Sequence, residues 1–376
     1  MSREPWFAAP SPCPPGPIAI IGSGIAGACL AHALTKRGRD VTLFDTEPAG
    51  GASGNPAGLV MPRLDADDGP VAQFYRDAFL FALSFYASRG AAFDPCGGTI
   101  ATDPAKIEGL KARNLWPEQA LRYEADHIAI DQAGVLRPRE AVLGLIKDLR
   151  QIKATVVGVA KHDDLYAVKT DAEIHDGFAG IVWATGAAYQ ARHAEEVRPS
   201  LGQVDVFEGP VPDRVHTDGH YIAPLEDRLV AGATYAPHHG EPIEPSPENT
   251  ASNKACAEEL LGQPVGAPLQ SRAALRATTT DRHPIAGPLY DRQAALDAYA
   301  GLAKGVPTEY PPAPYDGHEY ALTGLGSRGL VTAPLLAEHV AAQVTGSASP
   351  LTAQMAVIVH PGRFLIRGIK RGKITR

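Results

Sequence analysis

Three closely spaced glycines near the N-terminus constrain the fold more than any other feature of this sequence. They lie in residues 22–27 (GSGIAG), which match the pattern G-x-G-x-x-G. Residues 18–21 before them are all apolar, the alanine- and leucine-rich residues 28–37 follow, and a second apolar run over 41–44 ends at Asp45. This order predicts a buried strand, a glycine turn, a helix and a second buried strand with an acid at its end. It is typical of a dinucleotide-binding unit.

Each glycine of this unit has its own predicted role. Gly22 permits the tight turn, Gly24 lets the backbone approach a pyrophosphate, and Gly27 lets the helix pack closely on the strand. The helix N-terminus offers free N–H groups to the phosphates. Asp45 accepts hydrogen bonds from the ribose hydroxyls, which argues against a 2′-phosphate there. The cofactor contacts expected from this unit are Gly22, Gly24, Ile25, Ala26, Gly27, Asp45 and Thr46.

The next segment, GGASGNPAGLVMP over residues 50–62, consists mostly of small residues. Its backbone can lie against a flat ring system, because few side chains hold a ligand away. As an isolated string it is equally compatible with a flexible loop. The contacts expected here are Ala52, Ser53, Gly54, Asn55, Gly58 and Leu59.

The rest of the chain alternates between two styles of sequence, which indicates two domains. Buried strands and long helices are expected over 139–187 and 320–346, whereas 201–282 alternates short strands and turns as antiparallel sheets do. We therefore expect an α/β protein with a Rossmann-type nucleotide-binding domain and a discontinuous α+β substrate domain. The expected boundaries are 1–16 for a disordered, proline-rich lead-in, 17–76, 136–200 and 318–346 for the nucleotide-binding domain, 77–135 and 201–317 for the substrate domain, and 347–376 for a basic C-terminal tail.

Composition narrows the functional classes. The four cysteines form no C-x-x-C pair, and the adjacent His238 and His239 lack a third ligand at useful spacing, so no metal is expected. No apolar run approaches the roughly 20 residues of a membrane span, and the N-terminus lacks a secretory pattern. These features favour a cytoplasmic protein without a membrane partner. The net charge of −7 gives no general attraction to nucleic acid, and a DNA partner is not expected.

One segment departs from this acidic average. The C-terminal RFLIRGIKRGKITR over 363–376 carries six arginines and lysines and no acid. A solvated tail and a phosphate-contacting patch are both compatible with this composition.

With these motifs in order, the chain resembles the D-amino-acid-oxidase-like family of FAD oxidoreductases. Within it, the chain looks most like the FAD domain of the bifunctional enzymes that make 5-methylaminomethyl-2-thiouridine in tRNA. The resemblance covers most of residues 17–351 and is carried by IIGSGIAGACLAHALTKRG, GASGNPAGLVMPRL, GQV, GATY, LRATTTDRHPIAGPL and LTGLGSRGL. It implies a glutathione-reductase-like domain with non-covalently held FAD. The bifunctional relatives carry a methyltransferase domain for which this chain has no room, so a stand-alone oxidoreductase is expected.

The resemblance also implies cofactor contacts outside the first unit. Residues 156–157 match a strand whose backbone meets adenine, and ATG over 184–186 ends a buried strand. GSRGL over 326–330 would bring backbone N–H groups and a helix start to the flavin pyrimidine edge, where reduction builds negative charge. Ser327 is compatible with a capping role, and Arg328 with contact to the flavin or to a phosphate. These contacts are Val156, Val157, Ala184, Thr185, Gly186, Gly326, Ser327, Arg328, Gly329 and Leu330.

The implied reaction is oxidation of the carbon–nitrogen bond of an N-substituted glycine. The implied substrate is 5-carboxymethylaminomethyl(-2-thio)uridine at the tRNA wobble position, which would give the aminomethyl form and glyoxylate. Arg276 matches the place where relatives hold the substrate carboxylate, and its planar guanidinium suits a bidentate pair; a structural salt bridge is the alternative. Tyr235 is a weaker candidate for lining the pocket, with a core tyrosine as its alternative. Leu201 is a departure, because the relatives often have an arginine before Gly202-Gln203.

Two other functions remain open from the sequence. One is a small-molecule oxidase of glycine, sarcosine or D-amino acids, which would use the same FAD site and Arg276. The other is a non-catalytic flavin-binding interaction protein. The pair of GASGN and GSRGL motifs and the basic tail favour tRNA as the partner. A separate methyltransferase as a second partner is left open.

Overall fold

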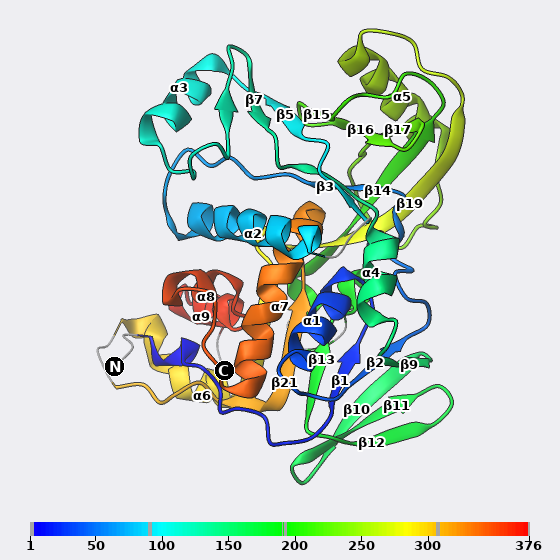
Figure 1. The fold of residues 1–376 in the computed structure, drawn as a ribbon. Coiled ribbons are helices and arrows are strands. Elements are labelled where there is room, and N and C mark those ends of the chain that lie inside the picture. Colours follow the sequence, from blue (N-terminus) through cyan, green and yellow to red (C-terminus); the bar gives the residue numbers. More distant parts are fainter. Residues whose placement is uncertain (1–3, 89–91, 190, 192–193, 306–308, 375–376) are drawn as a thin grey trace.

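The computed structural model describes residues 4–88, 92–189, 191, 194–305 and 309–374. Its nucleotide-binding half is built on a six-stranded sheet in the order β20-β21-β13-β1-β2-β9 (Figure 1). Five of these strands run parallel, and β20 runs antiparallel to β21 at one edge. The strands are β1 (Ile18–Ile21), β2 (Val41–Asp45), β9 (Arg150–Lys153), β13 (Gly180–Trp183), β20 (Ile285–Tyr290) and β21 (Tyr315–Thr323).

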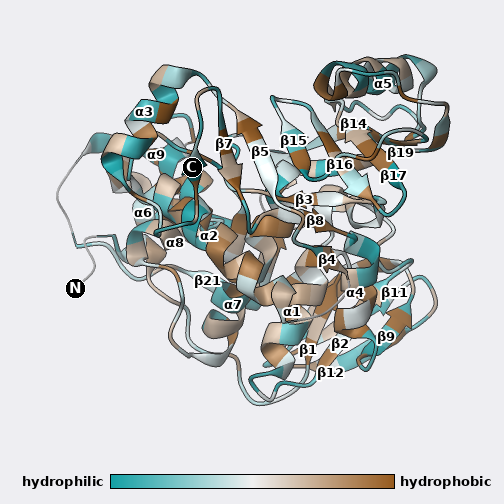
Figure 2. Cartoon of the chain, turned by 45° about the horizontal axis from the view of Figure 1, so that its top comes forward, coloured by the Kyte–Doolittle hydropathy of each residue, from teal (hydrophilic) through white to brown (hydrophobic). Residues whose placement is uncertain are grey.

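Both faces of this sheet are covered, which is why β1 is apolar at every position. Ile18 and Ile20 pack with the helices of one face, whereas Ala19 and Ile21 pack with a three-stranded meander on the other. Helices α1 and α7 are mostly in apolar colours where they pass through this core (Figure 2). The covering elements are α1 (Ile25–Thr35), α4 (Pro138–Ile146) and α7 (Gly329–Thr345), and the meander is β10 (Val156–His162), β11 (Leu165–Thr170) and β12 (Ile174–Phe178).

The second half is an antiparallel sheet that carries α5 on one side. Its strands follow the order β18-β14-β17-β16-β15-β5-β7-β6, and β19 pairs with β14 along almost its whole length. The long β14–β19 ribbon runs down from this sheet toward the nucleotide-binding half (Figure 1). The strands are β5 (Gly98–Ala101), β6 (Arg122–Tyr123), β7 (His127–Ile130), β14 (Val197–Phe207), β15 (Val215–Thr217), β16 (Tyr221–Leu225), β17 (Arg228–Gly232), β18 (Ala236–Pro237) and β19 (Pro268–Thr279).

The remaining elements connect the two halves or flank them. A small sheet pairs both β3 and β4 with β8, and α2 packs against α7 and α8. In the described part of the chain, no helix is both long and apolar enough to cross a membrane. The elements are β3 (Gly58–Val60), β4 (Phe93–Asp94), β8 (Gly134–Leu136), α2 (Pro70–Ala87), α3 (Pro104–Arg113), α5 (Pro247–Leu261), α6 (Arg292–Tyr299), α8 (Ala353–Val359) and α9 (Arg363–Lys370).

The predicted α/β class with a second antiparallel sheet is confirmed, but three boundaries differ. Strand β20 lies in a segment expected to belong to the substrate domain, yet it is the edge strand of the six-stranded sheet. The expected boundary at 76 falls inside α2, and β14 begins before the expected boundary at 200. These differences arise because an edge strand and a bridging helix have the same local pattern whichever half they pack on.

The prediction of a disordered lead-in is wrong for residues 4–16. The side chain of Trp6 is 5% exposed, and its ring meets Tyr299 and Tyr310 edge to face at centroid distances of 5.9 and 5.7 Å. Cys13 is also buried, with its thiol 3.8 Å from the Tyr320 hydroxyl. A proline-rich segment loses little backbone entropy on ordering, so two buried anchors are enough to hold it.

Of the two alternatives left open for the basic C-terminal segment, a solvated tail does not describe residues 353–370. Residues 353–359 and 363–370 form the helices α8 and α9. In α9, Phe364, Leu365, Ile366 and Ile369 are buried, so the cations occupy an amphipathic helix and not a loose end. Even Arg363 is 4% exposed. The last of the six cations, Arg376, lies outside the described residues.

Candidate functional site

In the glycine turn after β1, neighbouring backbone lies so close to the glycines that no side chain would fit. Gly22 has a φ of +103°, and a Cβ there would collide with the carbonyl of Ala184 at the end of β13. A Cβ at Gly27 would collide with the carbonyl of Gly22. A Cβ at Gly24 would lie 3.2 Å from the Ser53 hydroxyl. The structure therefore places three predicted cofactor segments side by side around this turn.

The small-residue loop folds over the start of α1. Ser53 lies in a short 3₁₀ turn over residues 52–54, and its hydroxyl accepts a 2.9 Å hydrogen bond from the backbone N–H of Ile25. The N-cap residue of α1, Gly24, has no side chain to make that bond. A polar oxygen is thus already held at the helix N-terminus, where an anionic oxygen is stabilised.

Asp45 is fixed beside the same turn. Its Oδ2 accepts hydrogen bonds from the backbone N–H and the hydroxyl of Ser23, at 2.6 and 2.9 Å. Its Oδ1 accepts a 3.3 Å bond from the N–H of Glu47, across Thr46. An ionised carboxylate has about four acceptor positions, so Asp45 keeps capacity to accept from hydroxyl groups of a ligand.

The end of β13 contributes an unsatisfied polar atom. Among the described residues, neither the Thr185 hydroxyl nor Oδ1 of Asn55 has a hydrogen-bond partner, although both atoms are buried. Gly186 turns the chain at φ +55°, and its carbonyl accepts a 3.1 Å bond from Thr323. Buried polar atoms without partners are costly, so the pair of Thr185 and Asn55 fits a site that a polar ligand completes.

The GSRGL segment forms a 3₁₀ turn and the start of α7, as the resemblance implies. Gly326 has a φ of +59°, and Ser327 is exposed. Leu330 packs against Gly58, where a Cβ would collide with it. The Arg328 guanidinium donates to the carbonyl of Pro62 at 3.4 Å, and burial lowers its pKa. Its side chain therefore reaches the loop that follows β3.

The predicted adenine segment adjoins Asp45 through its preceding residue. The N–H of Ala154 donates to the Asp45 carbonyl at 3.1 Å. Val156 packs under the meander, whereas Val157 is 57% exposed, and the pairing of β10 with β11 shifts between Val156 and Gly158.

Arg276 and Tyr235, the two predicted substrate residues, are in contact. The guanidinium carbon of Arg276 lies 4.6 Å from the centre of the Tyr235 ring. One of its nitrogens donates to the carbonyl of Thr234 at 3.3 Å. A Cβ at Gly202 on the paired strand would collide with that guanidinium. Tyr235 is 56% exposed and is therefore not a core tyrosine.

A second tyrosine, Tyr221, also lies near Arg276, in surroundings that differ from those of the exposed Tyr235. Tyr221 is half-buried, and desolvation raises its pKa to about 12 while the charge of Arg276 opposes the shift. No carboxylate pairs with Arg276 among the described residues, so the alternative of a structural salt bridge finds no partner in the structure. Its charge is available to a ligand.

The Gly202-Gln203 motif divides its two residues between two faces of β14. Gly202 makes room for Arg276, whereas Gln203 points toward α5 and donates to Asp205 at 3.0 Å and to Thr250 at 2.9 Å. Asp205 is fully buried and also accepts a 2.6 Å bond from Asn253. Gln203 is therefore part of a polar network that joins α5 to the sheet, and Leu201 does not take part in it.

Sequence reasoning missed Arg272. Its guanidinium donates to the carbonyls of Gly50 and Gly51, at 2.7 and 2.9 Å, and a Cβ at Gly54 would lie 2.6 Å from it. The bonds join residues more than 220 positions apart, which no local pattern can predict. One signal was available: Arg272 and Arg276 are four residues apart on a strand, so both point to the same face of β19.

No metal was expected at the adjacent histidines His238 and His239. His238 lies 3.3 Å from Glu241. Within the described ranges, no three His, Cys, Asp or Glu side chains are grouped as metal ligands would be.

Comparison with known families gives one match over most of the chain. Residues 17–343 match the family described as FAD dependent oxidoreductase. Two similar proteins carry the name tRNA 5-methylaminomethyl-2-thiouridine biosynthesis bifunctional protein MnmC. The one from Magnetococcus marinus is 31% identical over 98% of this chain and 62% of its own length, and the one from Maricaulis maris is 32% identical over 95% and 56%. The chain thus spans about 60% of the length of these relatives.

Solved structures share the fold at low identity. Glycine oxidase from Geobacillus kaustophilus aligns with a TM-score of 0.70 and 18% identity, over 90% of this chain and 97% of that one. L-proline dehydrogenase from P. horikoshii aligns with a TM-score of 0.70 and 17% identity, over 94% and 98%. These similarities confirm the two-part fold.

Proposed function

Since the chain belongs to the family of FAD-dependent oxidoreductases, we propose that it oxidises the carbon–nitrogen bond of an N-substituted glycine, carried by a wobble uridine in tRNA. The observation that carries this proposal is the Arg276 guanidinium. It is held over Tyr235, is given room by Gly202, and has no carboxylate partner among the described residues. A planar cation held in this way suits a substrate carboxylate through two parallel hydrogen bonds. The names of the MnmC relatives support tRNA as the carrier.

The residues around the glycine turn fit FAD. Gly22, Gly24 and Gly27 give close access to backbone N–H groups, and Asp45 retains acceptor capacity for the ribose. The buried Thr185 hydroxyl has no partner among the described residues and suits a polar ligand. When bound, FAD would supply the oxidising power by accepting two electrons from the substrate. We propose non-covalent binding, because no described cysteine or histidine lies in the loops 22–27, 50–59, 184–186 or 326–330.

The proposed substrate is 5-carboxymethylaminomethyl(-2-thio)uridine. Its glycyl unit loses two electrons and two protons, one proton from the methylene and one from the nitrogen, and becomes an imine. Water then adds to the imine carbon, so that glyoxylate leaves and the aminomethyl uridine remains. Arg276 binds the carboxylate throughout, and Tyr235 fixes the plane of the guanidinium. We name no general base, because the amine binds in its neutral form.

The test is anaerobic flavin bleaching by four substrates. Purified holoprotein is mixed with tRNA that carries the carboxymethylaminomethyl group and, separately, with glycine, sarcosine and D-alanine. Bleaching by the tRNA alone is the expected result. Bleaching by a free amino acid alone would replace the proposal with a small-molecule oxidase, and bleaching by none would favour a non-catalytic flavin protein.

The proposal has two consequences for partners. The aminomethyl product is itself a substrate for methylation, so we propose that a separate methyltransferase acts after this protein. A tRNA substrate also places the reaction in the cytoplasm.

A further inference from the structure

A groove with a volume of about 470 Å³ lies at the C-terminal helix α9, away from the glycine turn. It is bordered by α9, by the N-terminal segment, by α8 and by the loop after β19. Four of its lining side chains are cations and two are acids. The charged and titratable lining residues are Glu4, Asp281, His283, Arg363, Arg367, Lys370 and Arg371.

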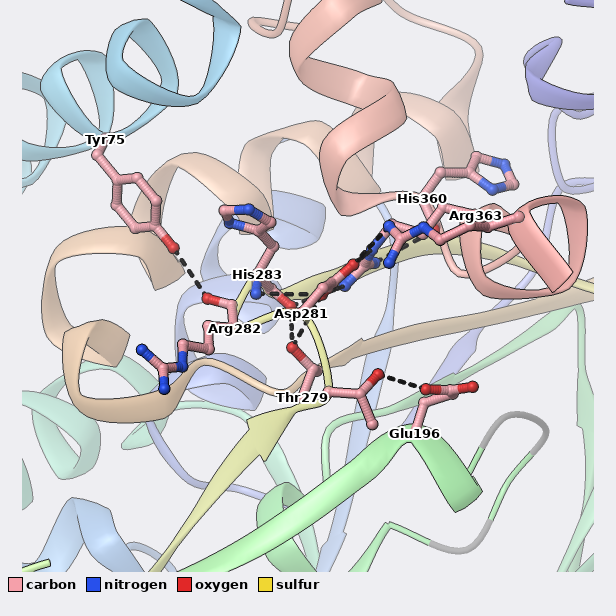
Figure 3. Close-up of polar contacts among 10 residues, drawn as sticks. Tyr75, Glu196, Thr279, Asp281, Arg282, His283, His360 and Arg363 are labelled. Carbon is pink, nitrogen blue, oxygen red and sulfur yellow. Dashed lines mark hydrogen bonds and ion pairs between the residues drawn. The ribbon is translucent and has the colours of Figure 1, made fainter. Parts of the chain in front are cut away.

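Asp281 fixes the position of α9 in this groove (Figure 3). Arg363 donates to both oxygens of Asp281, at 3.0 and 2.9 Å, and Arg367 donates to one of them at 2.8 Å. Arg363 also donates to the carbonyls of His360 and His283, so it is a fully engaged structural cation. The side chain of Arg367 is 41% exposed, and one carboxylate cannot neutralise both arginines.

The rest of the helix end is positively charged and faces solvent. Lys370 pairs with Glu4 at 3.2 Å and lies over the Trp6 ring. Arg371 and Lys373 are exposed, and no ion pair of either residue is found in the described part of the chain. The surplus charge of this groove therefore comes from residues 367–373.

A series of ring and guanidinium contacts connects the groove with the predicted cofactor loop. His283 lines the groove, and its ring lies 6.3 Å from the ring of Tyr75, as measured between centroids. The guanidinium carbon of Arg63 lies 4.6 Å from the centre of the Tyr75 ring. Arg63 also forms an ion pair with Asp65 at 2.8 Å. Arg328 of the GSRGL segment reaches the carbonyl of Pro62, next to Arg63.

The chemistry of the groove favours a phosphate backbone over an acidic protein surface. Three of its four cations are arginines, and guanidinium groups bind phosphate oxygens through planar, paired hydrogen bonds. The chain as a whole is acidic, with a net charge of −7, so the positive groove gives a polyanion one place to bind.

We propose that the α9 groove binds the sugar–phosphate backbone of the RNA whose modified uridine enters the Arg276 site. This inference rests on the proposed function and adds the surface through which the RNA is held. Asp281 is a positioning residue here, because it acts by holding Arg363 and Arg367 in place.

The experiment uses two charge-reversal variants of the full chain. R371E/K373E removes the two exposed cations beside the groove. R228E/K254E makes the same change in charge on β17 and α5, at the opposite corner of the molecule (Figure 1). Each protein is titrated with an unmodified tRNA transcript at several salt concentrations, and each is tested for flavin reduction by the free nucleoside 5-carboxymethylaminomethyluridine.

We expect R371E/K373E to bind tRNA at least about tenfold more weakly, with the slope of log affinity against log salt reduced by about 1 to 2. R228E/K254E should bind as the wild type does. Both variants should reduce flavin with the free nucleoside at the wild-type rate. A wild-type protein that oxidises neither nucleoside nor tRNA would overturn the proposed function. Unchanged tRNA affinity of R371E/K373E would overturn the proposed role of the groove.

Discussion

The proposed cofactor end and the proposed substrate end of this site are built in different ways. The cofactor end is made of backbone: Gly22 and Gly27 bring carbonyls and N–H groups into contact because their Cβ atoms are missing. The substrate end is made of side chains: Arg276 crosses from β19 and is held by Thr234 and Tyr235. A backbone cradle is disturbed by any added atom, whereas a side-chain clamp is disturbed by loss of one charged group. The two ends should therefore fail in different ways when they are mutated.

The largest effect is expected from Gly22→Ala. The new methyl would meet the Ala184 carbonyl at a backbone φ of +103°, so we expect a loss of about 4 kcal/mol in the free energy of unfolding and loss of bound FAD. Urea unfolding and the ratio of flavin to protein absorbance measure both. The matched control is Gly38→Ala, because Gly38 has a φ of +75° with open space around it and should cost about 1 kcal/mol. Equal effects of the two variants would show that conformation alone, and not close approach, requires glycine at position 22.

The Asp281→Asn variant tests another contact made by side chains, in the loop that follows β19. Burial raises the pKa of the Asp281 carboxyl, but the hydrogen bonds and charges of Arg363 and Arg367 outweigh it and hold the pKa well below its usual range. Removing the charge leaves the buried Arg363 uncompensated, so we expect a loss of about 3 kcal/mol at pH 7.

The pH dependence of the same variant has a definite sign. A carboxyl with a lowered pKa in the folded state stabilises the protein above its ordinary pKa of about 4, and this stabilisation is lost as the pH falls toward the folded value. The difference in unfolding free energy between wild type and Asp281→Asn should therefore shrink below about pH 4. A difference that stays constant down to pH 2.5 would contradict the role given to this carboxylate. The exposed Asp148→Asn serves as the control at every pH.

The substrate clamp is tested by a pair of variants that act on one guanidinium. Arg276→Ala should raise the KM for any carboxylate substrate by about 30-fold, because a charged hydrogen bond contributes about 2 kcal/mol. Gly202→Ala should have a similar effect without touching the arginine, since its methyl occupies the place of the guanidinium. FAD content should be unchanged in both. Gly144→Ala, with no heavy atom within 4 Å of the added methyl, is the control. A normal KM in Gly202→Ala would mean that Arg276 works equally well from another position.

The smallest effect is expected where the two ends meet. Arg272→Gln should weaken FAD binding to the apoprotein about fivefold, because the loop at Gly50 and Gly51 loses about 1 kcal/mol of charged hydrogen bonding. Flavin fluorescence titration measures the affinity, and the exposed Arg214→Gln is the control. If Arg272→Gln changed the substrate KM and left FAD affinity as it was, Arg272 would belong with the clamp and not with the cradle.

Parts of the site that depend on local sequence could be predicted. The turn at 22–27, the acid at Asp45 and the two small-residue loops lie where the sequence indicated, because a missing Cβ or a strand end has a local signature. Arg276 and Tyr235 were each singled out only through the family resemblance, and their contact with each other was not predicted. Arg272 and Asp281 were missed, because their partners lie far away along the chain, and the spacing of Arg272 from Arg276 says only that both lie on one face of β19.

The structure contradicts both the disordered lead-in and the solvated C-terminal tail, and the two expectations failed for the same physical reason. The proline-rich start and the basic end were both judged by their average composition. Each contains a few apolar residues that pack against the protein and hold the segment in place. Trp6 buries itself among tyrosines, and Phe364 with its neighbours turns α9 toward the core. Composition describes how a segment interacts with water, whereas a buried anchor depends on whether a complementary surface is present.

The sequence alone was enough to predict the class of fold and to propose where a dinucleotide would lie, because backbone turns, apolar strands and helix starts are fixed by neighbours a few residues away. Only the tertiary structure decided which charged groups are free to meet a ligand. Arg363 pairs with Asp281, and Arg272 donates to the carbonyls of a glycine loop. Arg276 donates only to a backbone carbonyl and keeps its charge for a ligand, although all three residues are arginines. The reason is that the energy of a charge depends on what surrounds it in space, and that is settled only when distant segments pack together.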